Sequence, residues 1–528
     1  MKTASKHVVH WFRRGLRLHD NPTLLETLAD ATTFRCIFIL DLAFARTSET
    51  SPNKWRFLLQ CLEDLDKSLR KLNSRLFVLR GQPTNVLPQL IKDWKFDILS
   101  FEEEPEPWGR DRDAKITELM RSHGVNVISK PGHTLYDISR ALSEEIDQIP
   151  LTYSEFLEMV RHRLGHPKNP VPSITIDIVP ALVPVSACAY DQLCSVPSLE
   201  ELGLHPEEMP QQHSWLGGET EALNRLQLYL SKKAAPTGPG DVSFSWECLL
   251  AQPSGLNPYL RFGCLSPKLV YSKLLQLYRQ SSADSEPPLS LFGHLLWREF
   301  FYWLAFTNPH FDQMEKNVIC VQIPWDQSPA ALAKWANAHT GYPFVDAVMT
   351  QLREEGAVHP LCKHVVASFL TKGDLFLSWQ QGAKVFDELS LDADWSVNNG
   401  TWLWLSGSSF LQNFLRTYHP VKFGKKLDPD GLFVKKFLPA LRKLPKEHVH
   451  EPWKAPPEVL TECKCVLGQD YPVPIVQHDL VVKLNARRIV QAYQFLVAFK
   501  GFQEKRVWST EEKSDGNGDS NKKFGCVS

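Results

Sequence analysis

The chain has 528 residues, more than a single hydrophobic core usually supports, so we expect two large domains. Its 59 Lys and Arg residues balance 60 Asp and Glu residues, which excludes any argument for nucleic-acid binding from net charge alone. The 11 cysteines show no repeated metal-ligand spacing, so no metal site is expected. With neither a signal peptide nor an apolar run of about 18 residues, we expect a protein of the reducing nucleus and cytoplasm, away from membranes.

The first part of the chain, residues 1–132, alternates short apolar runs with helical patterns. Trp55 and a series of leucines up to Leu72 recur at the spacing of a helix. This alternation predicts a doubly wound α/β domain with a mainly parallel sheet. The expected buried strands cover residues 7–12, 34–41, 74–81, 96–102 and 125–130.

The composition changes after the α/β domain. Residues 133–214, which are rich in proline over 166–200, predict an interdomain linker laid over the surface. Helical periodicity then dominates, so residues 215–503 predict an all-helical domain. Residues 504–528 are polar and rich in glycine and serine, which predicts a disordered tail, and Cys526 lies one place too late for a prenylation box.

The stretch LDADWSVNNGTWLW, residues 391–404, combines two carboxylates, two amides and three indoles. Carboxylates are costly to bury without donors, and a buried indole leaves an N–H in need of a partner. We therefore expect this stretch to border a large, flat ligand with polar edges. If a helix begins near Trp395, Asn398 and Trp402 lie on one face and Gly400 allows close approach. A large helical core is the alternative explanation for any single tryptophan.

Several segments carry a resemblance to a known family. Taken together, they are similar to the photolyase/cryptochrome flavoproteins, on the animal cryptochrome and (6-4) photolyase branch, from about residue 7 to 500. The resemblance implies a Rossmann-like N-terminal domain and an all-helical, photolyase-like C-terminal domain that binds FAD. The segments are WFRRGLRLHDNP (11–22), GGETEAL (217–223), GLNPYLRFGCLS (255–266), LLWREFFY (295–302), GYPFVDAVMTQLREEG (341–356), FLTKGDLFLSW (369–379) and LDADWSVNNGTWLWLS (391–406).

The resemblance assigns cofactor-binding roles residue by residue. Asp392 and Asp394 match carboxylates that face the flavin and ribityl edge, with helix caps ahead of Trp395 as the alternative. Asn398 matches the residue beside flavin N5, where an amide can donate to a reduced or protonated N5. Lys363 replaces an arginine expected to pair with Asp392, which keeps the charge but loses the bidentate geometry. The remaining matches are Ser254 and Asn257 in the phosphate-binding loop, where asparagine replaces the usual final serine, His294 in place of a glutamine, and Arg298.

Three tryptophans match the family's chain of indoles that relays an electron from the surface to photoexcited flavin. They are Trp402, Trp379 and Trp335. Indole suits this role because it is an oxidisable ring that can be buried with one hydrogen bond satisfied. Many animal members have a fourth tryptophan, but this chain has Phe376 at that position, so we expect the relay to stop at Trp335.

The segment GAVHPLCKH departs from the family's repair pattern GWIHHLARH, in which two histidines spaced four apart act on a (6-4) lesion. His364 remains as the catalytic candidate, but Pro360 replaces its partner. His359 lies roughly 140° away from His364 around a helix, so the two cannot share a face. Pro360 in a first helical turn would leave His359 near the cap. Ala357 also replaces a tryptophan of the lesion pocket.

Two further features bear on function. The family segment WVANFEKP has no counterpart in residues 232–246, so part of the FAD cover differs. Residues 419–446 are basic, which indicates either a solvated helical face or a segment for nuclear import and DNA contact.

We interpret the chain as a cryptochrome, a blue-light photoreceptor that signals through flavin photoreduction and protein partners in light or circadian regulation. The alternatives are a light-dependent (6-4) photolyase, an enzyme that also binds DNA, and a light-independent transcriptional repressor. An antenna chromophore of the folate or deazaflavin type is a further option that the resemblance leaves open.

Overall fold

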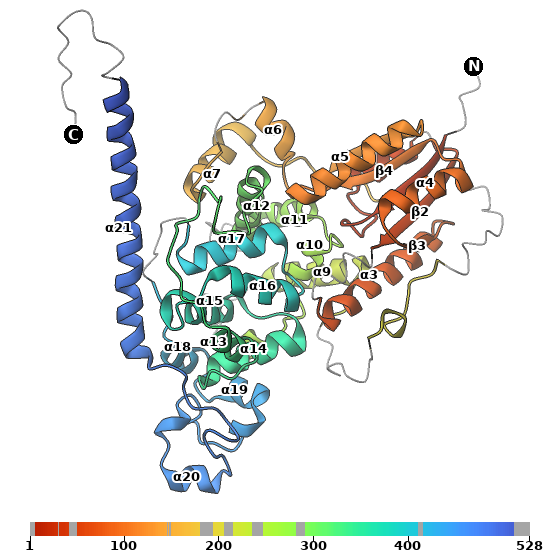
Figure 1. The fold of residues 1–528 in the computed structure, drawn as a ribbon. Helices are drawn as coiled ribbons and strands as arrows, with labels where there is room; N and C mark the ends of the chain where they lie inside the picture. Colours follow the sequence, from red (N-terminus) through yellow and green to blue (C-terminus); the bar gives the residue numbers. More distant parts are fainter. Residues whose placement is uncertain are drawn as a thin grey trace, which may run out of the picture.

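The structure is a computed structural model that describes residues 6–29, 31–41, 50–144, 146, 149–179, 194–204, 215–234, 246–280, 291–409 and 416–511. An α/β domain lies on one side of the molecule and a helical domain forms its centre (Figure 1). The predicted fold class, α/β followed by all-α, is confirmed.

The α/β domain is built on a five-stranded parallel sheet with the order β3-β2-β1-β4-β5. Its strands are β1 His7–Phe12, β2 Thr33–Leu40, β3 Leu76–Arg80, β4 Ile98–Glu103 and β5 Asn126–Pro131, as the apolar runs predicted. Helices cover both faces, which explains why the strands are almost continuously apolar. The helices are α1 Pro22–Leu28, α3 Pro52–Arg70, α4 Pro83–Trp94 and α5 Pro107–Ser122.

In the rest of the described chain the regular elements are all helices, and two isolated β-bridges are present. Proline occupies the first turn of many of these helices, where its missing N–H costs no hydrogen bond. The elements are α6 Ile138–Glu144, α7 Tyr153–Met159, η1 Val160–Leu164, η2 Glu200–Leu202, α9 Glu219–Ala234, η4 Trp246–Leu249, α10 Asn257–Arg261, α11 Pro267–Gln280, α12 Leu291–Thr307, α13 Pro329–Ala336, α14 Pro343–Glu355, α15 Pro360–Ser368, η5 Phe369–Gly373, α16 Trp379–Leu389, α17 Trp395–Ser406, α18 Pro420–Leu427, α19 Leu432–Phe437, η6 Pro439–Leu441, η7 Pro452–Lys454, α20 Pro457–Glu462 and α21 His478–Glu511.

Two predicted boundaries differ from the structure. The segment predicted as linker, residues 133–214, carries α6 and α7, and Tyr153 of α7 stacks on Trp297 of α12. Helix α21 continues past residue 503 to Glu511, because the run from His478 to Glu511 contains no proline to stop it. The remainder of the predicted tail, including Cys526, lies outside the described residues. Within the described ranges, no helix has the length and apolar character needed to cross a membrane.

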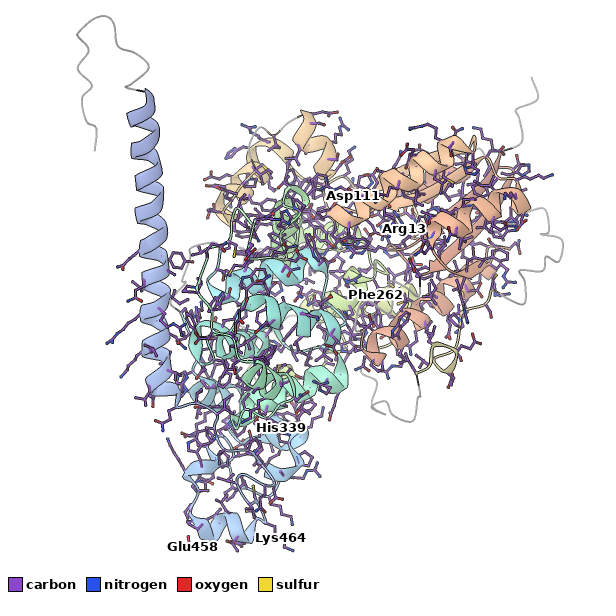
Figure 2. All side chains as sticks on the ribbon, viewed as in Figure 1. Arg13, Asp111, Phe262, His339, Glu458 and Lys464 are labelled. Atoms are coloured by element: carbon purple, nitrogen blue, oxygen red, sulfur yellow. The ribbon has the colours of Figure 1, made fainter. Side chains whose placement is uncertain are left out.

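The two domains share one hydrophobic core. A separate cluster lies between the sheet and the helices α4 and α5. The cluster on the opposite face, under α1 and α3, continues without a break into the helical domain. At this junction Phe262, labelled in Figure 2, packs against Phe57 of α3 with ring centroids 4.9 Å apart. The helical domain is therefore packed against the α/β domain over an apolar face.

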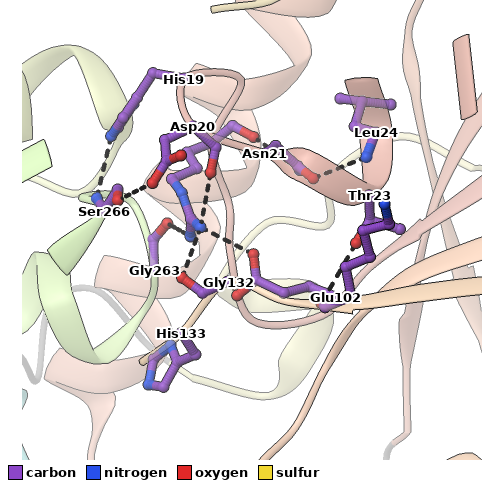
Figure 3. Close-up of polar contacts among 12 residues, drawn as sticks. His19, Asp20, Asn21, Thr23, Leu24, Glu102, Gly132, His133, Gly263 and Ser266 are labelled. Carbon is purple, nitrogen blue, oxygen red and sulfur yellow. Dashed lines mark hydrogen bonds and ion pairs between the residues drawn. The ribbon is translucent and has the colours of Figure 1, made fainter. Parts of the chain in front are cut away.

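A buried polar cluster fixes the two domains at the same junction (Figure 3). The Arg17 guanidinium donates to Glu102 Oε2 at 2.9 Å and to the carbonyl oxygens of Gly132 and Gly263 at 3.1 and 3.0 Å. Gly263 adopts φ +67°, and a Cβ there would lie 2.2 Å from the backbone nitrogen of Gly15. Only glycine fits at this position, because the two backbones touch.

Neighbouring side chains complete this cluster. His19 Nδ1 donates to Glu219, while its Nε2 accepts from the backbone N–H of Ser266 at 3.1 Å. The Ser266 hydroxyl donates to the carboxylate of Asp20. Since His19 and Asp20 belong to the α/β domain and Glu219 and Ser266 to the helical domain, these contacts set the relative position of the domains.

Arg17→Met tests the buried ion pair. It leaves Glu102 charged and unpaired in the interior, so we expect the free energy of unfolding to fall by about 3–5 kcal/mol. The matched control is Arg70→Met, which removes an exposed pair with Asp66 on α3 and should cost about 0–1 kcal/mol. Urea denaturation of both variants measures the difference, and equal losses would contradict the role given to Arg17.

Candidate functional site

Helix α17 carries the chemistry-rich stretch and begins where the sequence predicts. Asp394 is its N-cap, and the carboxylate accepts from the Ser396 N–H at 3.2 Å. The cap alternative is therefore confirmed for Asp394. Asn398 and Trp402 are both buried, on a helix packed against α16 and α12.

The Asn398 amide has one satisfied end. Its Nδ2 donates to the carbonyl oxygen of Ala383 on α16 at 2.9 Å, whereas its Oδ1 is buried and has no hydrogen-bond partner among the described residues. The unpartnered Oδ1 can accept from an N–H or O–H of a ligand. The amide nitrogen carries two hydrogens and uses one on Ala383, so the second can still donate, as the resemblance implies for flavin N5.

Close packing of α16 on α17 positions the Trp402 indole. A Cβ on Gly382 would lie 2.3 Å from Trp402 Cη2, so only glycine lets the ring occupy its place. Trp402 Nε1 is buried and, in the part of the chain that the structure covers, has no hydrogen-bond partner. A ligand acceptor would satisfy this N–H, as it would the unpartnered Ser396 hydroxyl.

The expected indole relay needs a correction. Trp335, Trp379 and Trp402 are all wholly buried, and the rings of Trp335 and Trp402 lie 6.1 Å apart. Trp335 Nε1 donates to the Val366 carbonyl at 3.1 Å. Trp335 is thus a core residue in contact with Trp402, and it is not placed to be the surface end of a chain that passes through Trp379.

Trp325 is the tryptophan that the sequence reasoning missed. It is partly exposed and packs on Phe376 with ring centroids 4.8 Å apart. A β-bridge joins Asp326 to Leu377, two residues before Trp379, so Trp325 lies beside the start of α16. It sits in irregular chain ahead of α13, where no periodicity marks it. Its one sequence signal is membership of the tryptophan-rich region from Trp297 to Trp404.

A buried polar network surrounds Asp394. Tyr302 donates to Asp394 Oδ2, and His133 Nε2 lies 3.4 Å from the same oxygen. Burial opposes ionisation, but His133, Arg14 and Arg298 outweigh it and hold the pKa of Asp394 well below its usual range. Arg298 bonds to the His133 carbonyl oxygen and ring at 3.0 and 2.9 Å. Asp394 and Arg298, both predicted cofactor ligands, thus also join the helical domain to His133.

Asp392 lies nearer the predicted phosphate-binding loop. Its carboxylate accepts from the Ser390 hydroxyl at 2.6 Å and from Asn257 Nδ2 at 3.4 Å. Ser254 is half-buried in the loop just before α10. The structure therefore brings the loop and this carboxylate together.

Lys363 does not form the expected pair with Asp392. Across the described ranges no ion pair links them, and Lys363 Nζ lies 5.0 Å from the centroid of the Phe386 ring. Burial lowers the pKa of Lys363, while the charge of Asp392 acts to raise it. A single ammonium on a flexible stem does not reach as an arginine fork would.

The histidine segment matches the prediction drawn from Pro360. His359 is the N-cap of α15, with its ring accepting from the Leu361 N–H at 3.1 Å, and Pro360 occupies the first turn. His364 lies on the helix, with Nδ1 3.1 Å from the Tyr418 hydroxyl. Burial, followed by Lys363 and Arg416, lowers the pKa of His364 to about 4. The ring is therefore neutral at pH 7. His294 is exposed on α12.

The carboxyl edge of the parallel sheet is where ligands bind in open α/β folds. Here the chain's own side chains occupy the place between β1 and β4. The Arg13 guanidinium carbon lies 4.7 and 4.4 Å from the ring centroids of Trp11 and Phe101, and the guanidinium pairs with Asp113.

Known proteins match this chain over nearly its full length. Residues 8–173 match the family described as DNA photolyase, and residues 291–491 match the FAD binding domain of DNA photolyase. Chicken (Gallus gallus) cryptochrome-1 is 50% identical over 512 residues, which cover 97% of this chain and 82% of that protein. Chicken cryptochrome-2 is 52% identical over 493 residues, covering 93% and 84%.

Solved structures of this family have the same fold. A bacterial class III photolyase from Agrobacterium tumefaciens superposes with a TM-score of 0.77 at 26% identity, covering 94% of this chain and 99% of that one. The fold and the site therefore define a class of flavoproteins in which a parallel α/β domain is joined to a helical FAD-binding domain. The chain belongs to the photolyase/cryptochrome family, on its animal cryptochrome branch.

Gly382→Ala tests whether close packing holds the Trp402 ring. We expect overpacking to lower the free energy of unfolding by about 1–3 kcal/mol. Trp402→Phe removes the ring atoms that the new methyl group would meet, so the same glycine substitution should cost less in that background. A double-mutant cycle by chemical denaturation measures this coupling. Equal costs in the two backgrounds would show that Gly382 and Trp402 do not constrain one another.

Proposed function

We propose that the protein is an FAD-binding blue-light photoreceptor of the cryptochrome type, which signals to protein partners. The observation that carries this proposal is the buried face of α17, where Asn398 Oδ1 and Trp402 Nε1 lack partners among the described residues. Unpartnered buried polar atoms of both kinds, donor and acceptor, fit a polar-edged cofactor. The family assignment names that cofactor as FAD.

Bound FAD supplies blue-light absorption and, when excited, the power to take one electron from a nearby indole. The chain's own residues prepare its site. Asn398 Oδ1 offers an acceptor for an N–H donor on the ligand edge, and the hydrogen bond from Nδ2 to the Ala383 carbonyl oxygen orients the amide. Asp392 and Asn257 approach each other, and Ser254 precedes Asn257 by three residues in the loop expected to bind the ligand's phosphates.

We place the electron relay on Trp402, Trp379 and Trp325. Trp402 lies at the buried end, and Trp379 begins α16, whose Gly382 touches the Trp402 ring. Trp325 is the partly exposed member beside the start of that helix. A relay must end where the oxidised indole can meet solvent, and Trp335 has no such exposure.

The residues around His359 and His364 give little support to the alternative function, repair of a (6-4) lesion. His359 is committed to capping α15, and the His364 ring is neutral at pH 7, so neither supplies a proton readily. Trp297 stacks on Tyr153 with centroids 4.0 Å apart and a 10° interplanar angle, and Trp404 lies 5.5 Å away. One face of the Trp297 ring is thus covered by the chain itself.

An absorption spectrum of the purified protein before and after blue light tests the proposal. Oxidised flavin that is photoreduced supports a photoreceptor. Protein that folds without flavin would instead favour a light-independent repressor. Flavin together with repair of a defined (6-4) lesion would favour the photolyase.

Clock or light-signalling proteins are the partners we propose, because the curated relatives are cryptochromes. We also propose that the protein resides in the nucleus and cytoplasm and contacts DNA. The feature that supports this is the basic segment, residues 419–446, which includes α18 and α19. Lys425, Lys436 and Lys446 of that segment pair with nearby acids, whereas Lys422 and Lys426 are exposed. A folate or deazaflavin antenna stays a prediction.

Blue-light bleaching of bound FAD should depend on the relay. We expect Trp402→Phe, Trp379→Phe and Trp325→Phe to slow it several-fold or more, because phenylalanine keeps most of the packing but is much harder to oxidise. Trp335→Phe is the matched control, a buried indole outside the route, and Trp215→Phe is a remote one. Initial bleaching rates at fixed light intensity decide the matter. A rate lowered by Trp335→Phe and unchanged in Trp325→Phe would restore the route predicted from sequence.

Wild-type protein should leave a (6-4) lesion intact under blue light. Pro360→His restores the second histidine but leaves Ala357 without an aromatic contact worth about 1–3 kcal/mol, so we expect little repair from it alone. The Pro360→His/Ala357→Trp variant has the best chance. Recovery of a blocked restriction site after illumination measures repair, and efficient repair by the wild type would overturn the photoreceptor reading.

A further inference from the structure

Two cysteines meet across the domain junction. Cys61 lies on α3 of the α/β domain, and Cys264 follows α10 in the helical domain, 203 residues away in sequence. Both are wholly buried, and the Cys264 thiol donates to Cys61 Sγ across 3.4 Å. Cys320 and Cys463, by contrast, donate to backbone carbonyl oxygens.

The backbone on both sides of this pair is held tightly. On the Cys61 side, a Cβ on Gly217 would lie 2.3 Å from the Phe57 carbonyl oxygen and 2.9 Å from Cys61 Sγ. On the other side, Cys264 stands between Gly263, which accepts from Arg17, and Ser266, which bonds to His19 and Asp20. The two thiols therefore cannot drift apart while the domain junction is intact.

We propose that Cys61 and Cys264 are an oxidation site, at which a peroxide converts the two thiols into a disulfide that links the two domains. This inference does not depend on the proposed photoreceptor function. The sulfurs must close from 3.4 Å to about 2.05 Å, a movement of roughly 0.7 Å each that side-chain rotation can supply. Fixed neighbours on both sides favour this bond over any other pairing.

The reaction balances with hydrogen peroxide as the oxidant. One thiolate attacks a peroxide oxygen, the O–O bond breaks, and a sulfenic acid forms with release of water once protons are counted. The second thiol attacks that sulfur, forms the S–S bond and releases a second water. Two thiols have then lost two electrons and two protons, and one peroxide has become two waters.

The buried surroundings of Cys61 and Cys264 determine how fast the two thiols are oxidised. Burial and the Cys264 thiol raise the pKa of Cys61 well above its usual range, and the backbone N–H of Gly218 opposes this only in part. Little thiolate is present at neutral pH, so oxidation is slow and needs a small oxidant. The same burial shields the finished disulfide from reductants. The site therefore responds to sustained oxidation and retains the result.

The consequence is a covalent link between domains that are otherwise held by packing and hydrogen bonds. A disulfide that closes so long a loop restricts the unfolded chain strongly. We expect the oxidised form to unfold at a temperature higher by several degrees. It should also resist dithiothreitol in native buffer and yield to it only in denaturant.

Peptide mapping of the native protein after hydrogen peroxide tests the site. Free thiols are blocked with N-ethylmaleimide before non-reducing digestion, and we expect a peptide pair joined through Cys61 and Cys264. Cys61→Ser and Cys264→Ser should lose both the linked peptide and the rise in melting temperature, while Cys248→Ser, a half-exposed control, keeps both.

Recovery of Cys61 and Cys264 as two free, alkylatable thiols after peroxide would overturn the proposal. So would a linked peptide that joins either of them to another cysteine, or a peroxide-induced rise in melting temperature that survives in Cys61→Ser. Because the mapping is performed on wild-type protein, it decides the matter even if a serine variant fails to fold.

Discussion

The Arg17 guanidinium is the contact on which the arrangement of the molecule depends. It is wholly buried and reaches the end of strand β4, the end of β5 and the helical domain at once, through Glu102, Gly132 and Gly263. A buried cation is costly unless it is paired and hydrogen-bonded, and the bonds made by the two terminal nitrogens of Arg17 tie all three backbone segments together. Gly132 leads directly to His133, which bonds to Arg298 beside Asp394. The domain junction and the start of α17 are therefore parts of one polar network.

Close contacts between apolar groups fix α16 and α17 in a similar way. Glycine at position 382 lets the Trp402 ring lie against the α16 backbone, and Gly400 gives Phe301 a similar place on the other side of α17. Interiors are packed too densely for such rings to shift without a cost. A helix held between two close contacts presents Asn398 and Trp402 in fixed orientations, which is what a cofactor with defined polar edges requires.

Regular periodicity made most of the fold predictable from the sequence. Each of the five strands lies within two residues of its expected range, because buried parallel strands read as continuous apolar runs. The helix at Trp395 and the cap at His359 also followed from local signals. The details of the candidate site were harder to predict from the sequence. Which end of the Asn398 amide is free depends on the Ala383 carbonyl, on a different helix. The exposure of Trp325 and the burial of Trp335 depend on tertiary packing, and both residues look alike in sequence.

Pro360 shows how a change can be neutral for the fold and decisive for chemistry. At the first turn of α15 it forfeits no backbone hydrogen bond, and its fixed φ suits the helix start. His359 then becomes the cap, so a ring that could move a proton instead accepts a backbone N–H. His364 remains, but it stands near Lys363, Lys372 and Arg416, whose positive charges disfavour the imidazolium. Burial and Arg416 lower the pKa of Lys372 to about 8, so the positive charge of this neighbouring lysine is also disfavoured. Adding a proton to His364 is unfavourable in these surroundings, and this electrostatic effect acts in the same direction as the loss of the second histidine.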